Sequence, residues 1–238
     1  MSSCRALYLH QSFISPPQRS GTSSSSHQNI SLLFKMKTTT LFTLFASSVV
    51  AIPAALAPRA SQCPTIPQIA PTGQLPPGTL NPTFLQPISQ KNPNKAFPAG
   101  QSAIVTPHDK CTLTKFDIPA SAQNKTCSLA LFLGGCQQDQ SEKGPGNIIF
   151  QGNLGIRFPV AGQTTWNNQP PLAPPFADAP IIKLGNAYRL GGGPCDYTPG
   201  QDFTSVGGSI CSNDTTLSFN QNNGGRGKCP VGFHIIIE

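Results

Sequence analysis

Short apolar segments, interrupted by turn-forming residues, constrain the fold of this chain more than any other feature. From Phe84 onward, apolar and polar residues alternate over a few positions at a time, and glycine, proline or asparagine recurs between these runs about every ten residues. No window combines an apolar period of 3.6 residues with helix caps, so helices should be few. The pattern predicts an all-β fold, an antiparallel β-sandwich. The candidate strands are Ala103–Val105, Cys111–Ile118, Cys127–Leu133, Ile148–Phe150, Leu154–Val160, Ile181–Leu184, Ala187–Leu190, Asp202–Val206, Thr215–Phe219 and Phe233–Ile237.

The segment 36–57 indicates the compartment. Lys35 and Lys37 precede an apolar stretch that ends in small residues, which is typical of a secretory signal peptide. We expect cleavage after Ala51 or Ala57. The stretch is too short, and too often interrupted by serine and proline, to supply the roughly 20 apolar residues that span a bilayer. The exported cysteines should therefore meet an oxidising environment.

Residues 1–35 are rich in serine and contain no acidic residue. A mitochondrial presequence has this composition, but it would not need an export signal behind it, so we interpret 1–35 as a disordered gene-model extension. Removal of everything through Ala57 takes away four of the 16 basic residues and none of the nine acidic ones, which lowers the net charge from +7 to +3. With no basic cluster left, we expect no nucleic-acid partner.

The mature chain begins with a proline-rich stretch. Ten prolines fall between residues 58 and 98, with few periodic apolar positions. This composition favours extended backbone over a packed element. We interpret 58–83 as a linker or a loosely docked arm. Cys63 lies within it, so a disulfide that pins the arm to the domain at 84–238 is an alternative to a free arm.

Seven cysteines remain once Cys4 is excluded. Six lie in the domain and are disulfide candidates, with 15 pairings that the sequence does not distinguish. We expect Cys63 to be the unpaired one; the alternative is that another cysteine is left over. No Cys-x-x-Cys pair is present, so we expect no metal site. The disulfide candidates are Cys111, Cys127, Cys136, Cys195, Cys211 and Cys229.

Catalysis has little support in the sequence. Beyond Ala57 the chain has two histidines, His108 in a polar stretch and His234 in a candidate strand, where alternation should turn the ring to the solvent face. There is no Gly-x-Ser-x-Gly elbow, His-Glu-x-x-His helix or phosphate loop. Glu142 lies in a polar loop and Glu238 is the last residue, so neither resembles the general acid of a glycosidase. We predict no catalytic residue and no cofactor.

Two kinds of surface site are predicted. Asn124 and Asn213 begin acceptor sequons for N-glycosylation, whereas the sequon at Asn81 is blocked by its proline. A carbohydrate platform would need exposed aromatic side chains, and Trp166, in a loop rich in amides, is the first candidate. An equally good interpretation is that Trp166 folds back onto the core. The other platform candidates are Tyr188, Tyr197 and Phe203.

Three segments carry a family resemblance. Pro87–Pro93, Phe116–Pro119 with Lys125–Leu129, and Pro230–Ile235 resemble the fungal But-two C-terminal domain, described as a ubiquitin-three-binding protein module. The resemblance covers about 84–238. It implies a β-rich domain with cysteines, no catalytic constellation, and an intracellular partner, the activating enzyme of a ubiquitin-like system. A signal peptide conflicts with that partner, and the cysteines exceed what the family needs.

We therefore expect a secreted, glycosylated, disulfide-linked β-sandwich that is not an enzyme and binds a cell-wall polysaccharide or a surface protein. No membrane association is expected after cleavage. Two alternatives remain open. One is a secreted hydrolase of wall polysaccharide, with a site assembled from distant carboxylates. The other is an intracellular adaptor for a ubiquitin-like activating enzyme.

Overall fold

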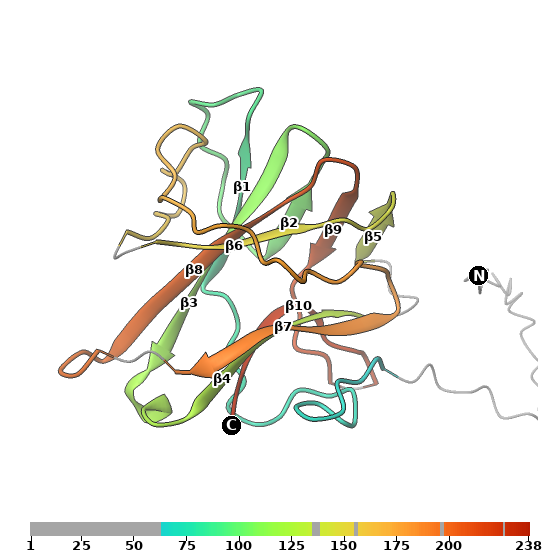
Figure 1. Ribbon diagram of the computed structural model, residues 1–238, viewed down its shortest axis with the longest axis vertical. Coiled ribbons are helices and arrows are strands. Elements are labelled where there is room, and N and C mark those ends of the chain that lie inside the picture. The colour runs from blue at the N-terminus through green and yellow to red at the C-terminus, as the bar shows by residue number, and fades with distance from the viewer. Residues whose placement is uncertain (1–62, 135–138, 155–156, 196–197, 226) are drawn as a thin grey trace, which may run out of the picture. The chain divides into compact units, whose positions relative to one another are not determined.

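The computed structural model describes residues 63–134, 139–154, 157–195, 198–225 and 227–238 (Figure 1). These residues form ten β-strands, one short 3-10 turn, η1 (Ala120–Ala122), and no α-helix. The predictions for residues 1–35, the signal peptide 36–57, Cys136 and Tyr197 lie outside this part of the chain. The strands are β1 (Phe84–Ser89), β2 (Ser102–Val105), β3 (Lys110–Pro119), β4 (Thr126–Leu133), β5 (Gln140–Lys143), β6 (Ile149–Gly152), β7 (Asn186–Pro194), β8 (Phe203–Cys211), β9 (Thr216–Asn220) and β10 (Val231–Ile237).

The strands form three antiparallel sheets, ordered β1-β3-β8-β6, β10-β4-β7 and β2-β9-β5. One main hydrophobic core receives Phe116 and Ile210 from the first sheet, Leu131 and Phe233 from the second and Phe219 from the third. Buried side chains from facing sheets therefore share one core, as in a sandwich. The predicted all-β, disulfide-linked fold is confirmed. In the described residues, no helix has the length and hydropathy to cross a bilayer.

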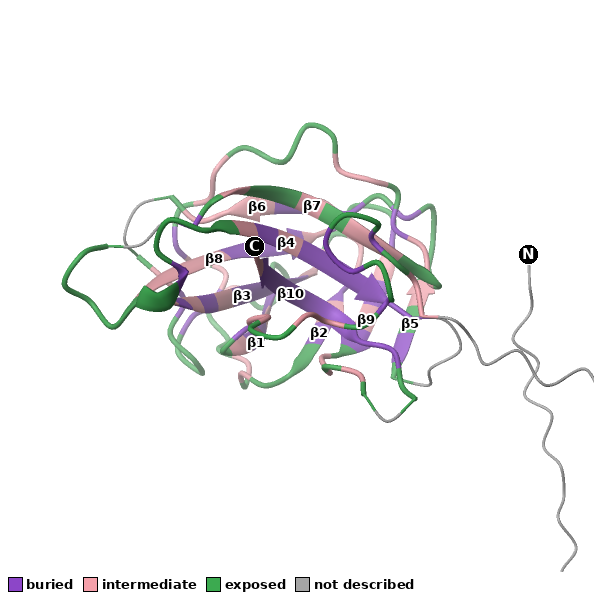
Figure 2. Cartoon of the chain, turned by 90° about the horizontal axis from the view of Figure 1, so that it is seen from below, coloured by how far each residue is buried: buried purple, intermediate pink, exposed green. Residues whose placement is uncertain are grey.

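In the second sheet, strands β4 and β10 are largely buried on both faces, whereas β7 is mostly exposed. In β4, Leu131 and Leu133 face the main core, while the alternate residues Ala130 and Phe132 pack in a separate cluster. Figure 2 shows β4 and β10 buried along most of their length. Double-sided burial explains why the sequences of these strands are almost continuously apolar.

The outer face of this sheet is covered by the proline-rich arm. Ile66, Ile69 and Ala70 are buried there against Phe132. Further along, Leu80 and Ile235 exchange backbone hydrogen bonds of 2.8 and 2.9 Å. The segment 63–83 is thus an arm that packs on the domain, and not a linker. The arm has few apolar residues, but it packs because they cover the outer face of the sheet, which no other element covers in the described residues.

The prediction that Cys63 is unpaired is wrong. Cys63 bonds to Cys229, across 166 residues. The pairing follows from the docked arm, which brings its N-terminal end to the loop before β10. Two further disulfides join Cys111 to Cys211 and Cys127 to Cys195. These three bonds use five of the six candidates in the domain and Cys63.

Two predicted strands, 154–160 and 181–184, are also wrong. The edge of β6 is lined by the proline-rich segment 170–176 and not by either of these predicted strands. Ala173 N–H donates a hydrogen bond to the Gly152 carbonyl, and Phe176 N–H donates one to the Phe150 carbonyl. Proline has no N–H, so this edge cannot form a complete ladder. Conversely, β1 and the polar edge strand β5 were not predicted.

Candidate functional site

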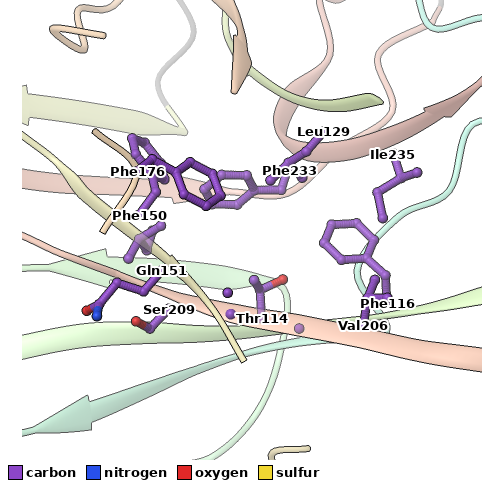
Figure 3. A pocket seen from close by; sticks show the side chains of 14 residues that line it. Thr114, Phe116, Leu129, Phe150, Gln151, Phe176, Val206, Ser209, Phe233 and Ile235 are labelled. Atoms are coloured by element: carbon purple, nitrogen blue, oxygen red, sulfur yellow. The ribbon is translucent and has the colours of Figure 1, made fainter. Parts of the chain in front are cut away.

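An apolar cavity of about 200 Å³ lies between two of the sheets (Figure 3). Phe116 from β3, Val206 and Ile210 from β8 and Phe150 from β6 form one side. The opposite side comes from the sheet that contains β4 and β10, through Leu129, Phe233 and Ile235. Among the described residues, no Asp, Glu, His, Lys or Arg lines it. The cavity therefore offers apolar contact and no acid or base.

Two glycines in one register row create this space. Thr114 of β3 pairs with Gly208 of β8, which pairs with Gly152 of β6. The next row on the same face holds Thr112, Ile210 and Phe150, all of which have side chains. Between rows with side chains, the glycine row leaves a gap that the facing sheet does not fill.

The two glycines differ in the space around their Cα atoms. A Cβ atom at Gly208 would collide with the carbonyl oxygen of Gln151, so glycine there permits the close approach of β6. A Cβ atom at Gly152 would meet no atom within 4 Å. Gly152 therefore borders open space, and a side chain could be added there without a collision.

One buried hydroxyl close to the cavity, that of Thr114, has no hydrogen-bond partner. Thr114 is 8% exposed, and its Oγ1 accepts or donates no hydrogen bond. It lies two residues before Phe116, on the same face of β3, and Figure 3 shows its side chain rising from β3 on the side of Phe233. A buried polar group without a partner destabilises a fold by about 1–3 kcal/mol. Ser209 Oγ also lacks a partner, but Figure 3 shows Ser209 beside Gln151, away from the phenylalanine rings.

Phenylalanine rings form one end of the cavity. Phe150 stacks on Phe176 at 6.4 Å between centroids and meets Phe233 edge-to-face at 6.3 Å. Phe176 comes from the proline-rich segment beside β6 and is 38% exposed. Gln151 Nε2 donates to the Ala173 carbonyl (2.8 Å) and ties that segment down. Phe176 therefore stands between the cavity and solvent.

A second buried feature, His234, lies beneath the arm. Its ring points away from Phe233 and Ile235, as predicted, but the prediction that it faces solvent is wrong, because the arm covers that face and leaves His234 fully buried. Its Nδ1 lies 3.0 Å from Asn81 Oδ1, and its ring meets Phe132 edge-on at 5.8 Å. Burial lowers the pKa of His234 to about 4, so the ring is neutral.

Of the predicted platform residues, the three that the structure describes do not come together. Trp166 is partly buried against Ile88 and Leu113 on the outer face of β1 and β3. Tyr188 packs at the main core, where its hydroxyl accepts a hydrogen bond from Lys183 N–H (2.8 Å) and burial raises its pKa. Phe203 is exposed, with the Lys115 ammonium 5.9 Å from its ring centroid. Trp166 thus folds back onto a small core cluster.

Three of the described carboxylates each have partners of their own. Asp109 accepts a hydrogen bond from Ser89 Oγ, which lowers its pKa, and Asp214 has its pKa lowered chiefly by the Asn147 side-chain amide. Glu142 pairs with Lys183 at 2.9 Å. Across the described ranges, no three His, Cys, Asp or Glu side chains gather as metal ligands.

The two sequons lie on exposed turns. Asn124 is exposed between η1 and β4, in the left-handed region at φ 63°. Asn213 is exposed between β8 and β9. The hydroxyl of the second sequon, Thr215 Oγ1, accepts a hydrogen bond from Gly146 N–H and is buried. Both asparagines are therefore accessible on the folded surface.

The cavity residues were not predicted. The available signal was the glycine pair Gly207-Gly208 inside a strand, because glycine in a strand interior often marks the close approach of another backbone. The partner of that pair, Gly152, is distant in sequence, and only the register of β6, β8 and β3 brings the row together.

Fold and cavity together define a disulfide-linked β-sandwich with an apolar interior site. The chain belongs to the family described as the ubiquitin 3 binding protein But2 C-terminal domain, which matches residues 80–225. The match begins at Leu80, where the arm meets β10, and ends before β10 itself. The segment Pro230–Ile235, part of the resemblance seen in the sequence, lies beyond it. No curated protein matches the chain.

Proposed function

We propose that this protein is an exported, glycosylated, non-enzymatic binding module that acts at the cell surface or in the cell wall, on a surface protein or a wall polymer. The observation that carries this proposal is the cavity, which has apolar walls and no titratable side chain. General acid–base catalysis needs a side chain that can exchange a proton with the substrate. The family is named for binding, which agrees with this proposal.

The disulfides support export. Three bonds close loops of 68, 100 and 166 residues. Such bonds persist in oxidising compartments and are rare in the cytosol. A partner met outside the cell therefore fits this chain better than the intracellular activating enzyme that the family resemblance implies. One of these bonds, Cys63–Cys229, also ties the docked arm to the domain.

Export is tested by the mass of the secreted chain. The full coding sequence is expressed in a eukaryotic secretory host, and the product is analysed by N-terminal sequencing and non-reduced intact mass. We expect a start between Ile52 and Ala60, two protons missing for each disulfide, and added glycan mass that falls in Asn124→Gln and Asn213→Gln. A start near Met1 with free thiols and no glycan would overturn the export proposal.

Binding is tested with the same preparation. Purified protein is incubated with insoluble β-glucan, with chitin and with intact cell surfaces, and its depletion from solution is measured together with the release of reducing sugar. Depletion without sugar release supports a binding module. New reducing ends would instead establish a hydrolase. Capture of a ubiquitin-like activating enzyme by the reduced, cytosolic chain, with no surface binding, would favour the adaptor.

A further inference from the structure

We propose that the cavity between the sheets binds a small hydrocarbon, an apolar molecule of about the size of toluene that carries no polar group. The inference goes beyond a surface or wall role, because a polymer chain or a protein surface does not fit inside such a space. Its evidence is the volume of the cavity, its apolar lining, and the fact that the polar side-chain groups near it are buried or already bonded.

The volume sets the size of the ligand. An engineered apolar cavity of about 150 Å³ stays free of water and binds benzene. At about 200 Å³, this cavity has room for one ring with a small apolar substituent. A cluster of water is unsuited to it, because each buried water needs two to four polar partners. An apolar molecule can therefore enter the space without competition from ordered water.

The glycine row across β8 and β6 keeps the cavity from closing. On either side of Gly208 along β8, Val206 and Ile210 point to the same core. The facing sheet rests on these larger side chains, and two packed sheets are held about 10 Å apart by the side chains between them. The facing sheet therefore cannot move into the gap that Gly208 and Gly152 leave, and the space is formed before any ligand arrives.

The polar groups near the cavity do not serve a ligand. The hydroxyl oxygens of Thr114 and Ser209 are buried, so a molecule between the sheets cannot reach them. Gln151 Nε2 donates to the Ala173 carbonyl (2.8 Å), and Figure 3 shows the Gln151 amide on the side away from Phe233. Strands β3 and β8 each pair with a strand on both sides, which uses their main-chain groups. A polar group on a ligand would therefore lose its hydrogen bonds to water and gain none.

Access runs past Phe176. This ring is 38% exposed, belongs to a segment without a complete hydrogen-bond ladder, and stacks on Phe150 at one end of the cavity. Rotation of one side chain on such a segment opens a path for a small molecule with no movement of the sheets. The entrance therefore agrees with the ligand size that the volume sets.

The test compares toluene with phenol, which have nearly the same size and differ by a methyl group in place of a hydroxyl. Each is titrated into the purified full chain and followed by methyl NMR. Toluene should give saturable shifts at Val206, Ile210 and Ile235, which line the cavity. It should bind on the order of ten-fold more tightly than phenol, whose hydroxyl finds no partner there. Phenol bound as tightly as toluene would overturn the proposal, as would the absence of saturable shifts with toluene.

A filling variant with a matched control tests the location. Gly152→Leu places a side chain where an added Cβ meets nothing within 4 Å, and it should abolish the binding of toluene. Gly100→Leu makes the same change in open space outside the cavity lining and should leave the affinity unchanged. Retained binding in the folded Gly152→Leu variant would refute the site. If that variant does not fold, the wild-type shifts decide, because shifts confined to Ile66 and Ile69 beneath the arm would equally refute a site between the sheets.

Discussion

Acid should destabilise this protein through His234. The ring is fully buried between the arm and β4, and its neighbours Asn81, Gln221 and Phe132 do not titrate. Burial holds its pKa at about 4 in the folded state, against 6.5 in the unfolded chain. The unfolded state therefore binds the proton first. The stabilisation is complete above pH 6.5 and is lost as the pH falls from 6.5 toward 4.

The magnitude follows from these two pKa values. Between pH 7 and pH 5, preferential protonation of the unfolded chain lowers the free energy of unfolding by about 2 kcal/mol, and full protonation of both states brings the loss to about 3 kcal/mol. Asp109 and Asp214 have pKa values below the ordinary 3.8, so their stabilising contributions are lost only at lower pH. The losses from these two aspartates therefore fall below the interval from pH 7 to pH 5.

The assay is urea unfolding of the oxidised protein at pH 7, 6 and 5. Wild type should lose about 2 kcal/mol over this interval, while His234→Gln, with a neutral side chain at that position, should lose much less. His108→Gln, a change at the exposed histidine, is the matched control and should keep the wild-type slope. Equal slopes for wild type and His234→Gln would refute the assignment of the acid sensitivity to His234.

Three further changes test the frame around the site. Replacement of both Cys63 and Cys229 by alanine frees the arm and should destabilise the protein by about 2–5 kcal/mol, measured by urea unfolding against the oxidised wild type; an unchanged midpoint would show that packing alone holds the arm. Phe132→Ala removes the ring on which the arm packs and should lower the free energy of unfolding by about 3–5 kcal/mol, whereas a loss under 1 kcal/mol would mean that the outer face is not a packed core. Gly146→Ala introduces a Cβ at φ 98° against the Ile182 carbonyl and should destabilise by about 2 kcal/mol or more, while Gly185→Ala, at φ 81° with open space around it, should show only the smaller conformational strain; equal melting temperatures of the two variants would contradict this reasoning.

Local pattern predicted most of the strands that are apolar on at least one face, although β1 was missed. The predicted segments Cys111–Ile118 and Cys127–Leu133 correspond to β3 and β4. Strand β5 was not predicted because its sequence, Gln-Ser-Glu-Lys, has no apolar alternation. This segment is a strand because it pairs with β9. The segment 181–184 has an apolar pattern because Ile182 inserts into the core from a loop.

The arm and the cavity could not be predicted because both depend on distant partners. A proline-rich sequence indicates extended backbone, but it does not say whether a sheet face lies exposed to receive it. The face that receives the arm belongs to β4 and β10, which follow the arm by about 50 and 150 residues. In the same way, Thr114, Gly208 and Gly152 form a row only because of the register in which β3, β8 and β6 pair. A register shift of one residue would turn every side chain of a strand to the opposite face of the sheet.

The limits of the family match differ from the limits of the packed unit. The match to 80–225 includes β1 to β9 but not β10, which pairs with β4 over seven residues and supplies Phe233 and Ile235 to the cavity. Nor does it include Ile66, Ile69 and Ala70, which bury the outer face of that sheet. Without β10, the edge of β4 would be unpaired and the cavity would lose one wall. The sandwich and its site are therefore properties of the chain from Cys63 onward, and the Cys63–Cys229 bond joins the two segments that lie outside the match.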